Sequence, residues 1–441
     1  MLSPVQVVQR LYDEFITWKR SGQALGSFLT SKDPRPVING YKLSKLEIAH
    51  YSFIASVFFF VLCVLDISIF FKLAAVAVLG TLVAMPITGQ FFLHGLPVLA
   101  WVALFFSSGK IPHSWKPPIS VKVLPSMETI LYGDNLSDLL AATTNRVLDL
   151  FAWFPYGIIH FSGPFIVAGL TFIFGPPTAV RSYAFAFGYM NLIGVIIQNM
   201  FPAAPPWYKL LHGLEPANYD MNGSPGGLGR IDDFFGFDMY TTTFSNAPVV
   251  FGAFPSLHSG CASMDALFLM YLFPSMTPLW CAYVCWLWWS TMYLTHHYFF
   301  DLTAGATMAL TFFSYVKYTS LPIINPKCFC RFSYTSISKF DIHGNDPLAP
   351  VFYQMPLDQL DEEAGVNAPF DEAFELSSLS SRQTTSQKSS RTPSPPNHSK
   401  SAPARAATPV SAGDSTTTSL FDERTDLQTS TSSASLQASL K

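Results

Sequence analysis

Two histidine-containing segments have the residue types of an acid–base or nucleophilic site. The first is FPSLHSG at 254–260, which contains His258, and the second is HHYFFD at 296–301. If the second segment is helical, His297 and Asp301 are at positions i and i+4 and face the same side. The carboxylate would then accept the N–H of one imidazole nitrogen and leave the other nitrogen basic, which is the base-and-orienter half of a catalytic triad.

Two other interpretations of these histidines stay open. One histidine at a membrane boundary is more often a satisfied polar residue, although the pairing of His258 with an H-x-x-x-D motif favours chemistry. Two histidines and an aspartate are also sufficient in kind as metal ligands. However, the sequence has no H-E-x-x-H motif and no Cys–His spacing of a zinc site. We therefore expect chemistry that needs no metal ion and no cofactor.

The residues around His258 also predict a binding site for an anion such as phosphate. Pro255 followed by Ser256 is typical of a helix start, with Ser256 or Ser259 as the N-cap. The backbone N–H groups of this first turn, through Gly260, would point at the anion. Further candidates for contacting a phosphate precede this turn, and they are Tyr208, Lys209 and Arg230. An interfacial aromatic belt with a solvated lysine is an equal alternative for the first two.

The elements that must position these residues are membrane-spanning helices. Of the 441 residues, 49% are hydrophobic and 12% are charged, whereas soluble domains are about 25% charged. A spanning helix needs about 20 largely apolar residues, and we expect an all-α polytopic membrane protein with about eight spans (six to eight). The candidates lie near 49–68, 70–88, 90–108, 154–175, 183–201, 259–276, 278–296 and 301–320. The net charge of −3 gives no reason to expect nucleic-acid binding.

The charges between the spans predict the topology and the domain organisation. Lys and Arg favour the cytosol, which places there the N-terminal arm at 1–48 and the C-terminal region at 321–441. The loops at 109–153 and 202–257 then share the lumenal face of the membrane domain at 49–320, together with both histidine segments. Three lysines in the first loop count against this topology, and they are Lys110, Lys116 and Lys122. From about residue 375 the chain is rich in Ser, Thr and Pro, which predicts a disordered tail.

The order of these motifs resembles the phosphatidic acid phosphatase type 2 (PAP2) superfamily, which carries P-S-G-H followed by S-R-x5-H-x3-D. The residues that match are Pro255, Ser256, His258, Ser290, His297 and Asp301. Leu302-Thr303-Ala304-Gly305 continues in the manner of the superfamily. The resemblance implies a helical catalytic core over about 120–320.

Departures from the superfamily pattern point to a subgroup. Leu257 replaces a Gly, Thr291 replaces an Arg, and the superfamily's first motif, K-x6-R-P, has no counterpart. Four segments are similar to the fungal inositol phosphorylceramide synthases, the target family of aureobasidin A. These segments are LYGDNLS at 131–137, FPAAPPWY at 201–208, FPSLHSGCA at 254–262 and THHYFFDLTAG at 295–305.

This resemblance implies transfer of phosphoinositol from phosphatidylinositol to the primary hydroxyl of ceramide, with release of diacylglycerol. His297 would be the nucleophile of a phosphohistidine-type intermediate, and His258 would be the proton donor and then the proton acceptor. The resemblance also implies residence in the Golgi membrane and a small regulatory membrane subunit. An acidic patch at 232, 233 and 238 could bind inositol hydroxyls, although a solvated loop face is the preferred interpretation. A lipid phosphate phosphatase, transfer of another head group and a non-enzymatic membrane scaffold are the alternatives.

Overall fold

The computed structural model describes residues 3–22, 29–35 and 43–337. Within these ranges the chain is built from helices without a named strand, and isolated β bridges join Ser120 to Ala203 and Ala203 to Gly252. The all-α class expected from the sequence is therefore confirmed for this part of the chain. The tail predicted from about residue 375 lies outside the described residues.

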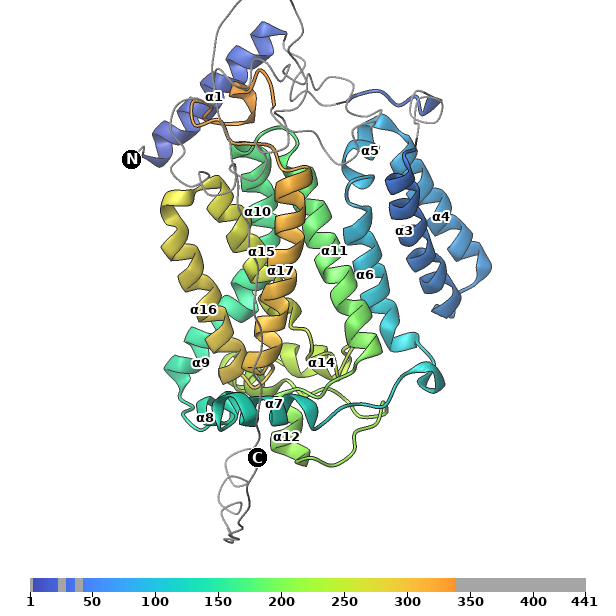
Figure 1. The fold of residues 1–441 in the computed structure, drawn as a ribbon, viewed down its shortest axis with the longest axis vertical. Coiled ribbons are helices and arrows are strands. Elements are labelled where there is room, and N and C mark those ends of the chain that lie inside the picture. Colours follow the sequence, from blue (N-terminus) through green and yellow to red (C-terminus); the bar gives the residue numbers. More distant parts are fainter. Residues whose placement is uncertain (1–2, 23–28, 36–42, 338–441) are drawn as a thin grey trace, which may run out of the picture. The chain divides into compact units, whose positions relative to one another are not determined.

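The long helices run through the bundle, and shorter helices connect them (Figure 1). The longer elements are α1 (Pro4–Ser21), α3 (Lys45–Val64), α4 (Ile69–Ala84), α6 (Leu96–Ser107), α10 (His160–Phe174), α11 (Ala179–Met200), α15 (Leu257–Leu272), α16 (Thr277–Tyr293) and α17 (Phe299–Thr319). The shorter elements are α5 (Pro86–Phe92), α7 (Val123–Tyr132), α8 (Leu136–Ala141), α9 (Arg146–Trp153), α12 (Pro206–His212), α13 (Gly229–Phe235) and α14 (Met239–Ser245). A π-helical segment, Phe154–Ile159, joins α9 to α10.

The helix lengths are those of a multi-pass membrane protein. Four of the described helical segments are long and apolar enough to cross a membrane, namely α3, α9 with α10, α11 and α17. The pair α4 and α5, bent by 103°, would make a fifth. The segments expected to span near 90–108, 259–276 and 278–296 correspond to the shorter helices α6, α15 and α16, of 12, 16 and 17 residues.

Helix α15 lies at the centre of a group of helices, where it packs against α10, α11, α16 and α17. Its sides carry small buried residues such as Gly260, Cys261 and Ala262, so neighbouring helices can approach it from several directions. Contact with α17 is closest at Gly305, where a Cβ atom would lie only 2.1 Å from the backbone oxygen of Ser256. Only glycine permits this approach, which brings the starts of α15 and α17 together.

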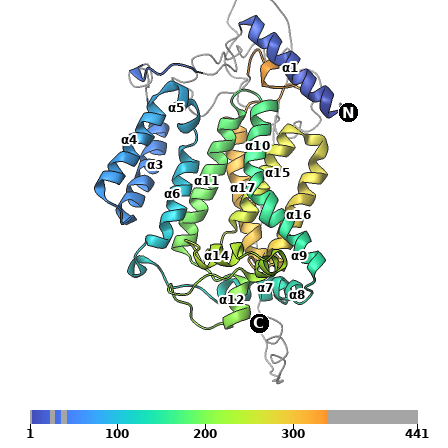
Figure 2. The ribbon, with the colours of Figure 1, turned by 180° about the vertical axis from the view of Figure 1, so that it is seen from behind.

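The two histidine segments therefore meet at one end of the bundle. The Ser256 N–H donates to the Asp301 carbonyl oxygen at 3.1 Å, and the Ser259 Oγ donates to the Leu302 carbonyl oxygen at 2.6 Å. Backbone hydrogen bonds join the loop at 202–257 to the turn between α16 and α17. In both views the short helices α7, α8, α12 and α14 lie at this end, and α1 lies at the opposite end (Figures 1 and 2).

Candidate active site

His258, His297 and Asp301 form a continuous hydrogen-bonded chain. The Nδ1 atom of His297 lies 3.0 Å from Oδ1 of Asp301, and its Nε2 atom lies 3.0 Å from Nδ1 of His258. The Asp301 side chain is fully buried, and His297 is 5% exposed. The structure thus brings together the three residues that the sequence assigns to catalysis.

The local fold that joins His297 to Asp301 differs from a continuous helical turn. Helix α17 begins at Phe299, and Tyr298 is its N-cap, so His297 precedes the helix. Asp301, in the first turn, reaches back and accepts the Tyr298 N–H through Oδ2 at 3.0 Å. The Asp301 carboxylate therefore holds both the start of α17 and the His297 ring in place. The expected i, i+4 contact forms, although Asp301 is helical and His297 is not.

The hydrogen-bond partners indicate which imidazole nitrogens carry protons. An ionised Asp301 only accepts, so Nδ1 of His297 donates to it and Nε2 of His297 holds a lone pair. That lone pair accepts the Nδ1–H of His258. His297 consequently presents a basic nitrogen to the site, and His258 presents a proton donor beside it.

The histidines line a cavity of about 180 Å³. Its other lining residues include Gln198, Trp207, Phe244 and Leu257. Within the described part of the chain no Lys or Arg lines this cavity. Positive charge for an anionic substrate must therefore come from protonated imidazole and from oriented backbone N–H groups.

The start of α15 supplies such N–H groups, although not from every residue that the sequence suggested. Ser256 is the N-cap, and its Oγ accepts the Ser259 N–H at 3.3 Å. The Gly260 N–H is bonded to the Ser256 carbonyl oxygen. The N–H groups of Leu257 and His258 have no acceptor within the helix, so they are the groups of this turn available to an anion.

Two neighbours of the histidines, Tyr156 and His160, escaped the sequence analysis. The ring of Tyr156 stacks on His258 with centroids 4.7 Å apart and on His296 at 5.3 Å. His160 lies 4.5 Å from His258 by the same measure. Tyr156 belongs to the π-helical segment, a kind of helix irregularity found often at functional sites. The sequence could have pointed to His160, because a histidine inside an apolar span is a candidate functional residue.

The three other predicted phosphate contacts lie away from the cavity. Lys209 pairs with Asp138 of α8, and Arg230 donates to Oδ1 of Asp149 from two nitrogens, at 2.9 and 2.7 Å. The Tyr208 hydroxyl donates to the backbone oxygen of Glu215. None of the three lines the histidine cavity. Each instead makes a contact within or between the loops at 109–153 and 202–257, and each stays a prediction as a phosphate contact.

In the acidic patch at 232, 233 and 238, Asp232 stabilises the local fold. Asp232 is buried and accepts the N–H groups of Tyr240 and Thr241, at 3.0 and 2.7 Å, at the start of α14. These contacts occupy both carboxylate oxygens of Asp232, which leaves them poorly placed to bind a sugar hydroxyl.

Comparisons with known proteins agree with the motifs. The PAP2 superfamily model matches residues 124–315. The chain is 56% identical over 354 residues to the inositol phosphorylceramide synthase of Candida albicans, covering 77% of this chain and 75% of that protein. It is 55% identical over 369 residues to the inositol phosphorylceramide synthase catalytic subunit of Saccharomyces cerevisiae, covering 82% of this chain and 92% of that protein. No solved structure matches the chain. The chain belongs to the inositol phosphorylceramide synthase family, within the PAP2 superfamily.

Proposed function

We propose that this protein transfers phosphoinositol from phosphatidylinositol to the primary hydroxyl of ceramide and releases diacylglycerol. The observation that carries the proposal is the buried chain from Asp301 through His297 to His258, in a protein 55% identical to a named synthase over 82% of its length. A base oriented by a carboxylate and facing a second histidine is the arrangement that two successive phosphoryl transfers require.

In the first step, the hydrogen bond from Nδ1 of His258 to Nε2 of His297 opens, the freed Nε2 lone pair attacks the phosphorus atom, and the bond to the diacylglycerol oxygen breaks. His258, in its imidazolium form, gives its proton to that oxygen and becomes neutral. A bound phosphodiester anion favours the imidazolium form by its opposite charge. Asp301 keeps the Nδ1 proton of His297 in place and stabilises the positive charge that develops on the ring.

In the second step, the ceramide hydroxyl attacks the phosphoinositol group held on His297. Neutral His258 takes the hydroxyl proton and returns to its imidazolium form, and the N–P bond breaks to regenerate neutral His297. The first-turn N–H groups of Leu257 and His258 stabilise the phosphoryl oxygens in both steps. Protons and charges balance over the cycle.

The low positive charge of the cavity favours a phosphodiester substrate. A diester carries one negative charge, whereas a monoester carries up to two. Thr291, at the place of the superfamily's Arg, is buried, and its backbone oxygen accepts the N–H groups of His296 and His297 at 3.0 and 3.4 Å. The residue therefore shapes the turn that carries His297 and adds no charge, which suits a transferase acting on diesters better than a phosphatase.

The finer topology is also part of the proposal. We infer that all eight apolar segments expected from the sequence cross the membrane, because each overlaps one helix of the bundle; these helices are α3, α4, α6, α10, α11, α15, α16 and α17. The arm at 1–48 and the region at 321–441 then lie in the cytosol, on either side of a membrane domain at 49–320. The active site faces the Golgi lumen, and a small regulatory membrane subunit accompanies the protein.

A product assay tests the proposed activity. The purified protein is given phosphatidylinositol and a fluorescent ceramide, with phosphatidylcholine as a control donor. We expect fluorescent inositol phosphorylceramide and diacylglycerol in equal amounts. Release of free inositol phosphate without labelled product would identify a phosphodiesterase with water as the acceptor, and product from phosphatidylcholine alone would identify a transferase for another head group.

A further inference from the structure

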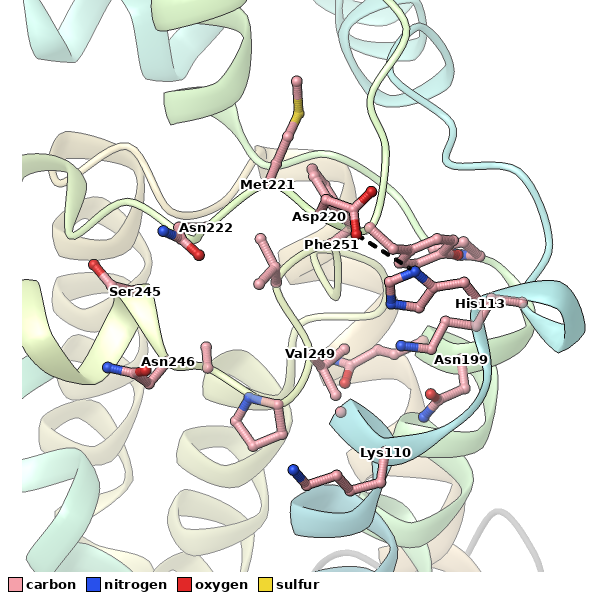
Figure 3. Close-up of a pocket in the computed structure, with 18 of the residues that line it drawn as sticks. Lys110, His113, Asn199, Asp220, Met221, Asn222, Ser245, Asn246, Val249 and Phe251 are labelled. Atoms are coloured by element: carbon pink, nitrogen blue, oxygen red, sulfur yellow. Dashed lines mark ion pairs between the residues drawn. The ribbon is translucent and has the colours of Figure 1, made fainter. Parts of the chain in front are cut away.

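A second cavity, of about 330 Å³, adjoins the histidine cavity. Its walls come from the segment after α6, the end of α11 and the loop at 202–257. Figure 3 shows Asn222, Ser245 and Asn246 on one side of this cavity, and His113 and Asn199 on the other. Its volume is within the range of about 300–1,000 Å³ typical of small-molecule sites.

The two cavities share one wall. Four residues line both of them, and they are Gln198, Ala247, Val249 and Val250. Gln198 is buried at the end of α11, and its Nε2 donates to the Pro255 carbonyl oxygen at 3.0 Å, two residues before the start of α15. A group bound in the second cavity is therefore adjacent to a phosphate held at the histidines.

The second cavity differs from the first in its chemistry. Beside apolar residues such as Phe106 and Phe251, it contains side-chain amides, two hydroxyls, a carboxylate and two lysines, Lys110 and Lys116. Neutral and charged hydrogen-bonding groups that converge from several sides suit a ligand covered with hydroxyl groups. Diacyl or ceramide chains would instead need apolar walls, so they fit this cavity poorly.

Several contacts hold the walls in position. Asn199 donates to Ser108 Oγ at 2.9 Å and thereby joins the end of α11 to the segment after α6. The Lys116 ammonium lies 4.8 Å from the centre of the Tyr219 ring, and the Tyr219 hydroxyl donates to the backbone of the loop before α7. Asp220 lies 3.7 Å from His113, as the dashed line in Figure 3 marks. The cavity is thus built jointly by the two loops that the sequence places on the lumenal face.

We propose that this second cavity binds the inositol ring of phosphatidylinositol, with the Lys110 ammonium, the Asn246 amide and the Asp220 carboxylate contacting the ring hydroxyls. The proposal rests on the proposed function, since it assigns the donor's head group to a place beside His258 and His297. The proposal also accounts for Lys110 and Lys116, two of the three lysines that count against the expected topology. Their presence in a lumenal loop is explained if their charges serve the binding of the substrate.

The test compares three variants of the full-length protein in detergent or vesicles. Lys110→Ala and Asn246→Ala each remove one group of the cavity wall. Lys122→Ala is the matched control, because Lys122 is exposed in the same loop and lines neither cavity. For each protein, KM and kcat are measured separately for phosphatidylinositol and for ceramide. Inhibition by soluble glycerophosphoinositol, which is the head group without acyl chains, is measured against glycerophosphocholine.

We expect Lys110→Ala to raise the KM for phosphatidylinositol by about tenfold, the size of one hydrogen bond to a charged group, and Asn246→Ala to raise it by about fivefold, the size of a neutral hydrogen bond. The KM for ceramide should stay unchanged, and inhibition by glycerophosphoinositol should weaken by a similar factor. Equal phosphatidylinositol KM values in all three variants would overturn the assignment and leave the proposed function intact. Absence of transfer by the unaltered protein would reject the proposed function itself, whatever the variants bind.

Discussion

At the residue scale, the candidate site consists of three hydrogen-bonded side chains, those of His258, His297 and Asp301. His297 and Asp301 were identifiable from their type and spacing, because polar residues at a membrane boundary are costly and are often functional. The contact between His258 and His297 was not derivable from spacing, since 39 positions separate them. It depends on the packing of α15 against α17, and that packing is a tertiary property.

The first prediction concerns the orienting carboxylate. Asp301→Asn should lower kcat by about 10³- to 10⁴-fold, because an amide can hold His297 in the wrong tautomer. The KM for either lipid should change little. Asp265→Asn is the matched control, since Asp265 is also buried and accepts the Tyr183 hydroxyl at 2.7 Å, but it lines neither cavity. A similar loss of kcat in both variants would contradict the specific role of Asp301.

The second prediction separates the ring of Tyr156 from its hydroxyl. Within the described residues the buried hydroxyl has no hydrogen-bond partner, whereas the ring stacks on two histidines. Tyr156→Phe should therefore keep the activity, and the loss of an unpaired buried hydroxyl should leave the thermal midpoint unchanged or higher. Tyr156→Ala should lower kcat at least about tenfold, because His258 loses the surface that fixes its ring. A large loss in the Phe variant would instead assign the hydroxyl to the substrate.

At the element scale, close contact between α15 and α17 aligns the site. Two backbone carbonyls of α17, at Asp301 and Leu302, accept hydrogen bonds from Ser256 and Ser259. Helix α7 also holds the start of α17, because its buried residue Glu128 accepts the N–H groups of Phe299 and Leu136. Burial raises the pKa of Glu128, and the two N–H groups it accepts act in the opposite direction. The start of α17 is thus held from two sides.

The third prediction tests this close contact. Gly305→Ala should reduce stability by about 1–3 kcal/mol and greatly reduce activity, because its Cβ atom would overlap the Ser256 backbone oxygen. Gly169→Ala in α10 is the control, since no atom lies within 4 Å of the added Cβ there. That helical substitution should be neutral or stabilising. Thermal unfolding followed by tryptophan fluorescence measures both, and equal midpoints would contradict the account of α15 and α17.

At the scale of the whole molecule, most of the fold was predictable from the hydropathy of the sequence and the order of its motifs. Each predicted apolar segment overlaps one helix, because burial in lipid imposes a length and a composition that the sequence must display, although only four or five of the described helical segments are long and apolar enough to span. The short helices α7, α8 and α9 were less predictable, since they depend on contacts with α16 and α17. The pairing of Lys209 with Asp138 and of Arg230 with Asp149 was not predictable from the sequence, because the partners are 71 and 81 positions apart.

The fourth prediction concerns topology. In sealed Golgi vesicles, a membrane-impermeant maleimide reaches only the cytosolic face. Lys19→Cys, in the N-terminal arm, should be labelled in intact vesicles, whereas Lys122→Cys should be labelled only after permeabilisation. The unaltered protein corrects for native cysteines. Labelling of Lys122→Cys in intact vesicles would place the loop at 109–153, and with it the active site, in the cytosol.

Trapping of the covalent intermediate tests the central claim most directly. The protein is mixed with phosphatidylinositol in the absence of ceramide and quenched in alkali, which preserves phosphohistidine, and its peptides are then analysed by mass spectrometry. The account predicts phosphoinositol on His297, formed in a burst with one equivalent of diacylglycerol and lost when ceramide is added. Label on His258, or product formation with no label on either histidine, would contradict it.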